Sequence, residues 1–519
     1  LFLHARKNNY ITLWRILHGF FGQKLKIFHG IFFFSLFSAP YCAIIAKKQA
    51  LEGGAHMSRL LLFFDDQALE NRENLSRDYG PAVLDADSVY HDPSGLSLCG
   101  GLPNVFFHEK EYWMLYNMLD ADSDDIFLCA AHSPDARAWQ PLDTTRLLEI
   151  PGRKLRNQIF PLCSGETGCV YQDLRVPREE RYKLFYCRYD LDAVRVRDEI
   201  FVSPDCLAWR RLDTTWNPDG AEPGMGCFYS PARETYMITT RPHWAERRIC
   251  ITETADWRTF SPVTLAVQAD SLDAPLCETY GMPVFEYENY AIGLLWLYFN
   301  PPGSATVADG VQAINESGRM YPELVYSLNG THFQRSLRKP FLHNGTPDAP
   351  SYGCIFANSM LVQGEQLRIF AACSQNEHGG FRTRGLGCIA SFTLKKDRFI
   401  FLESNGVGRL RTRNLLINGD LCVNAQCSGR LLFQLCDDSL HPVDGFSFAD
   451  CDVFRGDETD HLLSWHGRTA RELKGRSLKL EFWLEGGRIY AVKGDFLLLG
   501  FNQNRLYNRF GIVPDRKGF

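Results

Sequence analysis

The chain has 519 residues, a length typical of roughly two to four domains. Its 45% hydrophobic and 23% charged residues fit a globular protein and argue against a disordered chain or a polytopic membrane protein. The formal net charge is −5, yet residues 1–56 are basic, so the rest of the chain is more acidic than the whole. The negative potential of an acidic protein repels a polyanion, so we expect no nucleic-acid binding.

The first 56 residues differ in character from the rest. Residues 27–46 carry no charge and are long enough to span a bilayer, and basic residues precede them, as in a signal or anchor segment. The alternative is a start assigned too far upstream, because the first methionine is Met57. We expect residues 1–56 to be an extension outside the domains. Membrane contact is expected only if residues 27–46 are a real anchor.

Cysteine usage indicates a reducing compartment. Sixteen of the 17 cysteines follow Met57, without a Cys-x-x-Cys pair or the Cys/His spacing of a zinc site. Most lie in apolar runs such as residues 127–130, as buried thiols do. The sequence therefore predicts a cytoplasmic protein without a metal or cofactor. The alternative is an exported or membrane-anchored protein, through residues 1–56.

A turn motif repeats along the chain. The pattern Ser-Pro-Asp-x-x-Ala-Trp occurs at residues 133–139 and 203–209, and looser copies occur at residues 254–260 and 327–333. Each copy has Ser or Thr, then Asp or Asn, then an aromatic residue. Asp and Asn side chains bond the backbone in tight turns, and the aromatic residue returns the chain to a packed face. The irregular spacing favours blades joined by variable loops over a solenoid.

Short strands rich in β-branched and aromatic residues precede each turn. Residues 112–117, 182–187, 236–240 and 290–298 come before the four copies, and residues 367–373 begin a fifth unit. Another short strand precedes each of these. Radially repeated four-stranded sheets form a β-propeller, so we predict five blades within residues 57–405. A stacked sandwich is the alternative.

The pattern changes after Gly406. Short strands separated by Gly and Asp turns follow, including residues 431–435 and 478–484. We expect an antiparallel β-sandwich over residues 406–500 and a tail over residues 501–519. The predicted fold class is therefore all-β, a five-bladed propeller followed by a β-sandwich.

This order of domains resembles glycoside hydrolase family 32 and the related family 43 group. The resemblance covers roughly residues 60–495, and it includes these phrases: Arg181-Tyr182-Lys183, Tyr280-Gly281-Met282-Pro283-Val284, Gly445-Phe446-Ser447 and Gly456-Asp457. It implies carboxylates gathered in an axial funnel, where the innermost strand of each blade begins.

The family's catalytic motifs are matched only in part. Family 32 enzymes carry a nucleophile in Asn-Asp-Pro-Asn-Gly, a stabiliser in Arg-Asp-Pro and an acid/base in Glu-Cys. Here residues 91–95 read His-Asp-Pro-Ser-Gly, Asp173 lacks both flanking residues, and Cys277-Glu278 has the reverse order. The general plan therefore carries over, whereas cleavage of fructans or sucrose does not.

Applied to this sequence, the plan gives seven candidate carboxylates: Asp92, Glu166, Asp219, Glu222, Asp273, Glu278 and Asp348. Glycosidic cleavage requires an acid and a second carboxylate that acts as nucleophile or base. We expect Asp92 to be the nucleophile or base, Glu222 or Glu278 the acid, and Glu166 a reserve. Caps and solvated side chains are the alternative for each.

Substrate-binding candidates complete the expected site: Arg241, Trp244, Asp273 and His378. Tryptophan stacks on sugar faces, although tryptophan in a strand also serves as core.

The leading functional hypothesis is a glycosidase acting on terminal bonds of a small glycan or glycoside. One alternative is a glycoside phosphorylase, in which Arg241, His243, Arg247 and Arg248 would hold phosphate. The other is a carbohydrate-binding propeller without catalysis.

Overall fold

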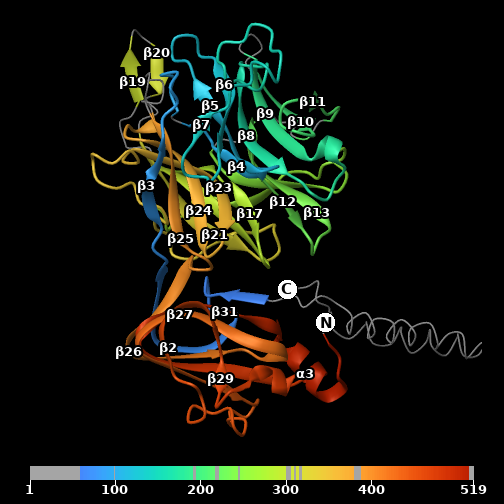
Figure 1. The fold of residues 1–519 in the computed structure, drawn as a ribbon, viewed down its shortest axis with the longest axis vertical. Coiled ribbons are helices and arrows are strands. Elements are labelled where there is room, and N and C mark those ends of the chain that lie inside the picture. Colours follow the sequence, from blue (N-terminus) through green and yellow to red (C-terminus); the bar gives the residue numbers. More distant parts are fainter. Residues whose placement is uncertain are drawn as a thin grey trace, which may run out of the picture. The chain divides into compact units, whose positions relative to one another are not determined.

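The computed structural model describes residues 59–513, except residues 99, 191–194, 215, 217–220, 243–245, 300–304, 309–310, 315–317 and 379–386. The chain from Ser58 onward forms one compact unit dominated by β-strands (Figure 1). Residues 1–58, which include the apolar stretch 27–46, lie outside the described residues. Within the described part, no helix has the length and hydropathy needed to cross a bilayer.

The first three blades are separate four-stranded antiparallel sheets. Their strands, in chain order, are β4 (Asn104–His108), β5 (Glu111–Leu119), β6 (Ile126–Ser133) and β7 (Gln140–Pro141); β8 (Gly165–Gln172), β9 (Tyr182–Asp190), β10 (Arg195–Ser203) and β11 (Arg210–Arg211); β12 (Ala221–Ser230), β13 (Thr235–Pro242), β14 (Ile249–Thr254) and β15 (Thr264–Val267).

Blades four and five are joined into one sheet by a parallel bridge between Met320 and Cys354. Blade four has a divided inner strand, and a hairpin of two short strands follows its second strand. The strands are β16 (Cys277–Gly281), β17 (Val284–Tyr287), β18 (Tyr290–Phe299), β19 (Ala305–Ala308), β20 (Val311–Ile314), β21 (Arg319–Ser327) and β22 (Gln334–Arg335), then β23 (Cys354–Gln363), β24 (Gln366–Ser374) and β25 (Cys388–Lys395) of blade five. The predicted five-bladed propeller is thereby confirmed.

The ring is closed by a strand that comes from the start of the chain. Strand β3 (Val83–Tyr90) pairs antiparallel with β25 and forms the outer edge of blade five. Its Asp85 accepts hydrogen bonds from Arg137 of blade one at 2.8 and 2.9 Å and from Arg368 of blade five at 2.7 Å. These bonds lower the pKa of Asp85 to about 2. One carboxylate thus ties the last blade to the first.

The repeated turns share one hydrogen-bond pattern. In blade one, Asp135 Oδ1 accepts the backbone N–H groups of Arg137 and Ala138, both at 2.9 Å. Asp205, Asp256 and Asn329 each accept the two equivalent N–H groups in their own blades. The residue after each acceptor has a positive φ, from 58° to 76°. The sequence repeat therefore marks one turn at the same place in four blades.

The C-terminal domain is a β-sandwich that also takes strands from the N-terminal side. Its sheet contains β1 (Arg59–Leu62), β2 (Leu69–Tyr79), β26 (Ile400–Thr412), β27 (Leu415–Cys436), β28 (Phe454–Leu462) and β31 (Ser477–Leu498). A small hairpin, β29 (Ser464–Trp465) and β30 (Arg468–Thr469), lies outside this sheet. Strands β1 and β2 were expected in the propeller, but they pair with β31 and β26.

Three short helical segments complete the described chain. The 3-10 helices are η1 (Arg178–Glu180) and η3 (Ala470–Leu473), and the α-helix is α3 (Phe501–Phe510). Helix α3 lies in the range expected to be a tail. Gln503 accepts a hydrogen bond from the Gly500 N–H at 2.7 Å, and Gly511 ends the helix in the left-handed conformation. These terminal signals, rather than apolar periodicity, define the helix.

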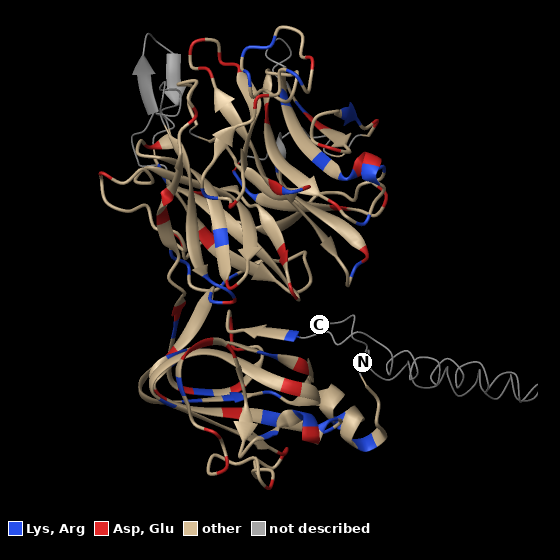
Figure 2. Ribbon diagram, in the orientation of Figure 1, with Lys and Arg blue, Asp and Glu red and all other residues tan. Residues whose placement is uncertain are grey.

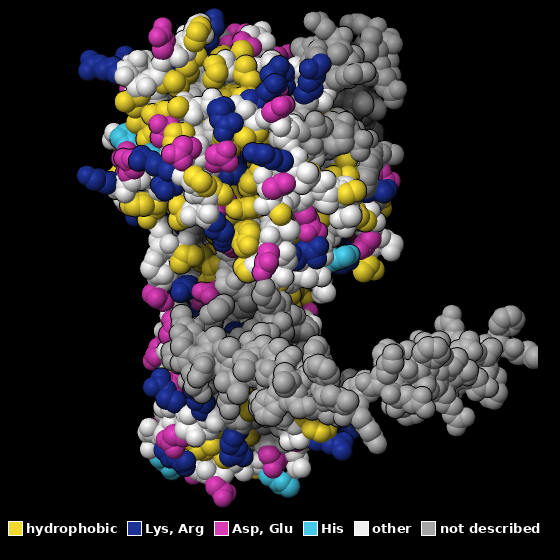
Figure 3. All heavy atoms as spheres, turned by 90° about the vertical axis from the view of Figure 1, so that its right-hand side faces the viewer, with side chains coloured by type: hydrophobic (Ala, Val, Ile, Leu, Met, Phe, Trp, Pro, Cys, Tyr) yellow, Lys and Arg dark blue, Asp and Glu magenta, His cyan; other side chains and the backbone are white. Residues whose placement is uncertain are grey.

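Charged side chains are mixed over both domains (Figure 2). In the space-filling view, basic and acidic side chains of the propeller lie next to one another (Figure 3). Many of them form ion pairs, such as Arg233 with Glu253 at 2.7 Å. All fifteen cysteines in the described residues are free thiols, and most are buried.

Candidate functional site

Three glutamates occupy the same position in three consecutive blades. Glu166, Glu222 and Glu278 are each the second residue of the inner strand of their blade, in β8, β12 and β16. Their partners on the second strands are Cys187, Arg241 and Tyr298. Because the blades repeat around one axis, equivalent positions lie at the same end of the ring. We call this end, where the inner strands begin, the strand-start end.

Glu278 forms an ion pair with Arg247 at this end. Its Oε2 lies 2.5 Å from Arg247 Nη1, and both side chains are partly exposed. The hydroxyl of Thr279 donates to the backbone oxygen of Arg247 at 2.9 Å. This bond holds the segment that leads into β14 beside β16. Arg247 also lies over the rings of Tyr280 and Tyr298, at 5.5 and 5.6 Å. Glu278 is therefore held at the junction of blades three and four.

Tyr280 connects this pair to blade five. Its hydroxyl is 2.9 Å from Nε2 of His378, which follows β24. On the other side, Arg241 stacks on the Tyr280 ring at 4.3 Å and donates to its backbone oxygen at 2.8 Å. Both Arg241 and His378 are buried. The predicted residues Glu278, Arg241 and His378 are thus brought together around a tyrosine that the sequence reasoning did not select.

Close packing fixes the strand that carries Glu278 and Tyr280. A Cβ on Gly281 would lie 2.5 Å from the Trp296 ring, so this position has room for glycine alone. Trp296 is fully buried, and its indole N–H donates to the Ala357 oxygen of blade five at 2.9 Å. The contact brings β16 close to its neighbours and sets the direction of the inner strand.

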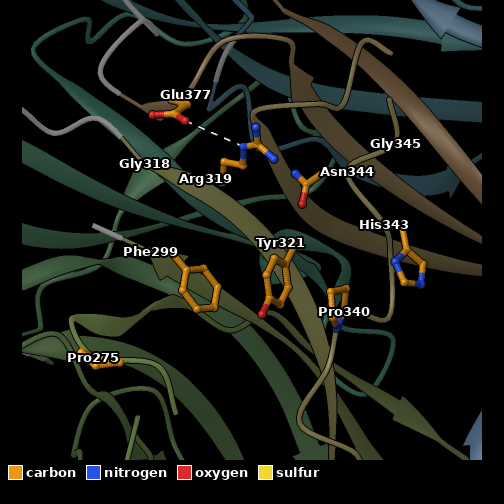
Figure 4. Close-up of a pocket in the computed structure, with 10 residues that line it drawn as sticks. All are labelled: Pro275, Phe299, Gly318, Arg319, Tyr321, Pro340, His343, Asn344, Gly345 and Glu377. Carbon is orange, nitrogen blue, oxygen red and sulfur yellow. Dashed lines mark ion pairs between the residues drawn. The ribbon is translucent and has the colours of Figure 1, made fainter. Parts of the chain in front are cut away.

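A cavity of about 680 Å³ lies beside this cluster (Figure 4). It is lined by residues of blades four and five at the same end of their strands. Its Gly318 accepts a hydrogen bond from the His378 N–H at 2.9 Å. Phe299 of the cavity directly follows Tyr298 in the chain, and Glu377 of the cavity directly precedes His378. The cavity and the Tyr280 cluster therefore share the same strand ends.

The cavity combines an aromatic wall with a charged pair. The rings of Phe299 and Tyr321 stack with centroids 5.0 Å apart. Burial raises the pKa of Tyr321 to about 12, so its hydroxyl keeps its proton at neutral pH. In Figure 4, Arg319 and Glu377 lie together opposite the two rings, with Arg319 Nε 3.8 Å from Glu377 Oε1. Arg319 also lies over the Tyr352 ring at 4.0 Å.

Sequence reasoning missed most of this cavity. It selected His378 but not Glu377 beside it, although both follow β24. It also selected none of Phe299, Arg319 and Tyr321, which lie at the ends of strands β18 and β21. The sequence did contain one usable signal, the position of these residues along their strands. Each lies at the end of its strand that is paired toward the start of β16, where Glu278 lies.

Asp92 lies in a different setting from the one expected for a nucleophile. It is 8% exposed. Its Oδ2 accepts hydrogen bonds from Tyr116 Oη at 2.6 Å, Asn157 Nδ2 at 3.0 Å and Tyr90 Oη at 3.1 Å, and its Oδ1 accepts the Ser94 N–H at 2.8 Å. Desolvation raises its pKa, but these bonds outweigh it and leave the pKa below the usual value. The setting favours a role in holding the loop; a catalytic role stays a prediction.

Asp273 belongs to a buried ion-pair network in blade four. Its Oδ2 lies 2.6 Å from Arg335, which also binds Glu323 through two hydrogen bonds of 2.7 and 3.0 Å. Desolvation raises the pKa of Asp273, but the opposite effect of Arg335 is larger, so the pKa lies below its usual value. The same burial raises the pKa of Glu323. Asp273 therefore stabilises the blade, which competes with the predicted contact to substrate.

The remaining candidates divide into three groups. Glu166 is partly exposed in β8. Glu222 is placed by its backbone in β12, but its side chain lies outside the described residues, as do Trp244, His243 and Asp219. Asp348 is exposed in a turn before β23. Among the described residues, no three His, Cys, Asp or Glu side chains converge as they do around a metal ion.

Comparisons with known proteins give likeness of fold. The chain matches no protein-family model and no curated protein. It is similar to the structure of a β-1,2-mannobiose phosphorylase from Listeria innocua in complex with β-1,2-mannobiose, at 12% identity over 62% of this chain and 97% of that one, with a TM-score of 0.41. It is also similar to an α-L-arabinofuranosidase from Podospora anserina in complex with cellotriose, at 12% identity over 60% and 97%, with a TM-score of 0.38.

A third similar structure is a thermostable family 43 glycoside hydrolase, at 12% identity over 59% of this chain and 92% of that one, with a TM-score of 0.39.

Proposed function

We propose that the protein is a glycoside hydrolase that cleaves a terminal glycosidic bond at the strand-start end of its propeller. The carrying observation is the matched position of Glu166, Glu222 and Glu278 on three consecutive inner strands. Glutamates at the same end of three blades would supply the two carboxyl groups that glycosidic cleavage requires. The adjoining cavity of about 680 Å³ falls in the range of small-ligand sites.

The surroundings suggest a division of roles. Arg247 compensates the charge of Glu278, which suits the carboxylate that acts as nucleophile or activates water. Glu222 or Glu166 would then protonate the leaving oxygen. This assignment differs from the sequence expectation, in which Asp92 was the nucleophile or base and Glu278 was, with Glu222, one of two candidates for the acid. The Phe299 and Tyr321 rings would pack against the apolar face of a sugar, and Arg319 and Glu377 would bind its hydroxyl groups.

The test is the turnover of a panel of aryl glycosides by Glu→Gln variants. We expect E278Q to lower kcat by about 100- to 10,000-fold, the usual contribution of a positioned acid or base. E222Q and E166Q identify the second carboxylate. E73Q, in strand β2 of the sandwich, is the matched control and should leave kcat unchanged. Full turnover by E278Q, E222Q and E166Q would refute the proposal.

Phosphorolysis is the second candidate. The observation that favours it is the pair of guanidinium groups of Arg241 and Arg247, which lie 4.3 and 5.5 Å from the centre of the Tyr280 ring. A phosphorylase would need added phosphate for turnover and would release a sugar phosphate. A hydrolase would release free sugar at the same rate with and without phosphate. Binding of sugars without any product would instead support a propeller that binds carbohydrate and lacks catalysis.

A further inference from the structure

Helix α3 packs on the sandwich domain through its polar side. Asn504 is the buried residue of the helix, and its Nδ2 donates to both carboxylate oxygens of Asp438, at 3.0 and 3.1 Å. Its Oδ1 accepts a hydrogen bond from the Ser477 hydroxyl at 2.6 Å, and Asn508 donates to Asp438 at 2.8 Å. A helix on a domain surface normally buries an apolar stripe. Here hydrogen bonds hold the polar side inward and leave the other side exposed.

The outward side of α3 carries large apolar side chains. Phe501 is 76% exposed, Phe510 60% and Leu506 44%, and Ile512 and Val513 just after the helix are exposed as well. A single exposed apolar residue is ordinary on a protein surface. A group of them within residues 501–513 is not, and such groups mark surfaces that bind another protein or a membrane.

Two arginines of α3 lie beside these rings. The guanidinium group of Arg505 is 5.6 Å from the centre of the Phe501 ring, and that of Arg509 is 5.1 Å from the centre of the Phe510 ring. Both arginines are exposed, and neither forms an ion pair with a described residue. Residues 501–513 contain no Asp or Glu. The positive charge of the helix is therefore not neutralised within it.

The neighbouring turn adds two more cations. The Tyr507 hydroxyl of α3 donates to the backbone oxygen of Gly475, which lies between Lys474 and Arg476 in the chain. Both of these side chains are exposed and form no ion pair with a described residue. Asp437 attracts Arg476 only from beyond ion-pair distance. Helix α3 and residues 474–476 thus form a surface that is cationic as well as apolar, and we call it the α3 surface.

We propose that the α3 surface binds an anionic lipid membrane. Phenylalanine and leucine side chains enter the boundary between headgroups and acyl chains, while arginine stems lie along apolar surface and their charged ends reach anionic headgroups. This contact is separate from the one that the sequence predicts through residues 27–46.

The charge of the α3 surface argues against the other occupants. A second copy of the chain would bring the unpaired cations of two helices face to face. A soluble polyanion would match the cations but leave the apolar side chains in water. The inference goes beyond the proposed function and does not depend on it.

The test places a fluorescent reporter on the α3 surface. Leu506→Trp adds a tryptophan to α3, and Leu462→Trp is the matched control in β28, at positions that are 44% and 42% exposed. Each full chain is mixed with vesicles of brominated phosphatidylcholine, with and without phosphatidylserine. Bromine quenches only tryptophans that enter the membrane. The readout is therefore local to each position, whether or not residues 27–46 bind the same vesicles.

We expect anionic vesicles to quench the tryptophan added at position 506 more strongly than the one added at position 462. Adding R505E/R509E to the Leu506→Trp chain should weaken its apparent affinity for these vesicles about tenfold or more, whereas R505K/R509K should leave it unchanged. Higher salt should also weaken binding, because it screens the attraction between arginines and headgroups. If Leu506→Trp does not fold, Phe510→Trp replaces it.

Equal quenching of the two added tryptophans, or quenching of neither, would overturn the proposal. Quenching that is as strong with neutral vesicles, or that R505E/R509E leaves unchanged, would overturn it as well. Analytical ultracentrifugation without vesicles provides the last check. A dimer that R505E/R509E dissociates would assign the α3 surface to a second copy and overturn the proposal, whereas a mass that this variant leaves unchanged supports it.

Discussion

At the scale of single residues, the site depends on groups that hold other groups in place. Glu278 is positioned by Arg247, and Arg247 in turn by the Thr279 hydroxyl. Gly281 sets the distance between β16 and the buried Trp296. Packing contacts of this kind convert small displacements into losses of activity, because catalysis needs aligned groups.

Gly281→Ala tests this packing. The added Cβ would lie 2.5 Å from the Trp296 ring, so we expect a loss of about 1–3 kcal/mol in unfolding free energy and a fall in kcat. Chemical denaturation and steady-state kinetics measure the two effects. Combining the change with Trp296→Phe should restore part of both, because the smaller ring gives way. Equal losses in the single and double variants would contradict the packing argument.

Asp92→Asn separates a structural from a catalytic role. In the variant, the NH2 group of Asn replaces one carboxylate oxygen. This new donor would point at groups that themselves donate hydrogen bonds to Asp92 in the unmodified chain. We expect a loss of about 1–3 kcal/mol in stability. Urea denaturation measures the change. Unchanged stability together with lost turnover would instead support the nucleophile predicted from the sequence.

At the scale of secondary-structure elements, the Asx turns explain why the repeat is visible. One side-chain oxygen accepts two backbone N–H groups, and the next residue takes a positive φ. The turn requires a short side chain that ends in an oxygen acceptor, and both Asp and Asn provide one. The four copies vary freely elsewhere.

Asp205→Ala should remove both bonds and lower stability by about 1 kcal/mol, as loss of a helix cap does. Asp205→Asn is the matched control and should be nearly neutral, because Asn329 already fills the equivalent place. Thermal unfolding compares the two. Equal destabilisation by Ala and Asn would show that charge, rather than hydrogen bonding, matters at this turn.

The predictable part of the structure follows from local chemistry. Turn residues and strand composition are short-range signals, so the five blades were predicted from sequence. The partners of β1 and β2 were not, because pairing with β31 and β26 joins residues more than 300 positions apart. In the site, carboxylates near strand starts were found. Tyr280, Arg319 and Glu377 were missed, because their role depends on which strand ends meet.

At the scale of the whole molecule, both domains are closed by strands from the start of the chain. Strand β3 completes blade five, and β1 and β2 complete the sandwich sheet. One hydrophobic core cluster contains Phe64, Tyr290 and Phe341 together with Phe433 of the sandwich. The sandwich and the propeller therefore share one cluster of buried apolar side chains.

The closure of the ring should depend on pH. The folded pKa of Asp85 is about 2, below its usual value near 4, so its ion pairs stabilise the fold above pH 4. That contribution is lost as the pH falls through about 2. Asp85→Asn should lower stability at neutral pH by about 1 kcal/mol, the scale of a solvent-screened pair, and should flatten this acid limb. Unfolding midpoints from pH 6 to pH 2 would show it; an unaltered acid limb in the variant would contradict it.

The central claim is that a sugar binds where Glu278 and its neighbours meet at the strand-start end. A crystal structure of the inactive E278Q protein with a glycoside that the unmodified chain cleaves tests it most directly. We expect the glycosidic oxygen beside Gln at position 278 and a sugar ring against Phe299 and Tyr321. A glycoside bound elsewhere, with this end of the propeller unoccupied, would contradict it.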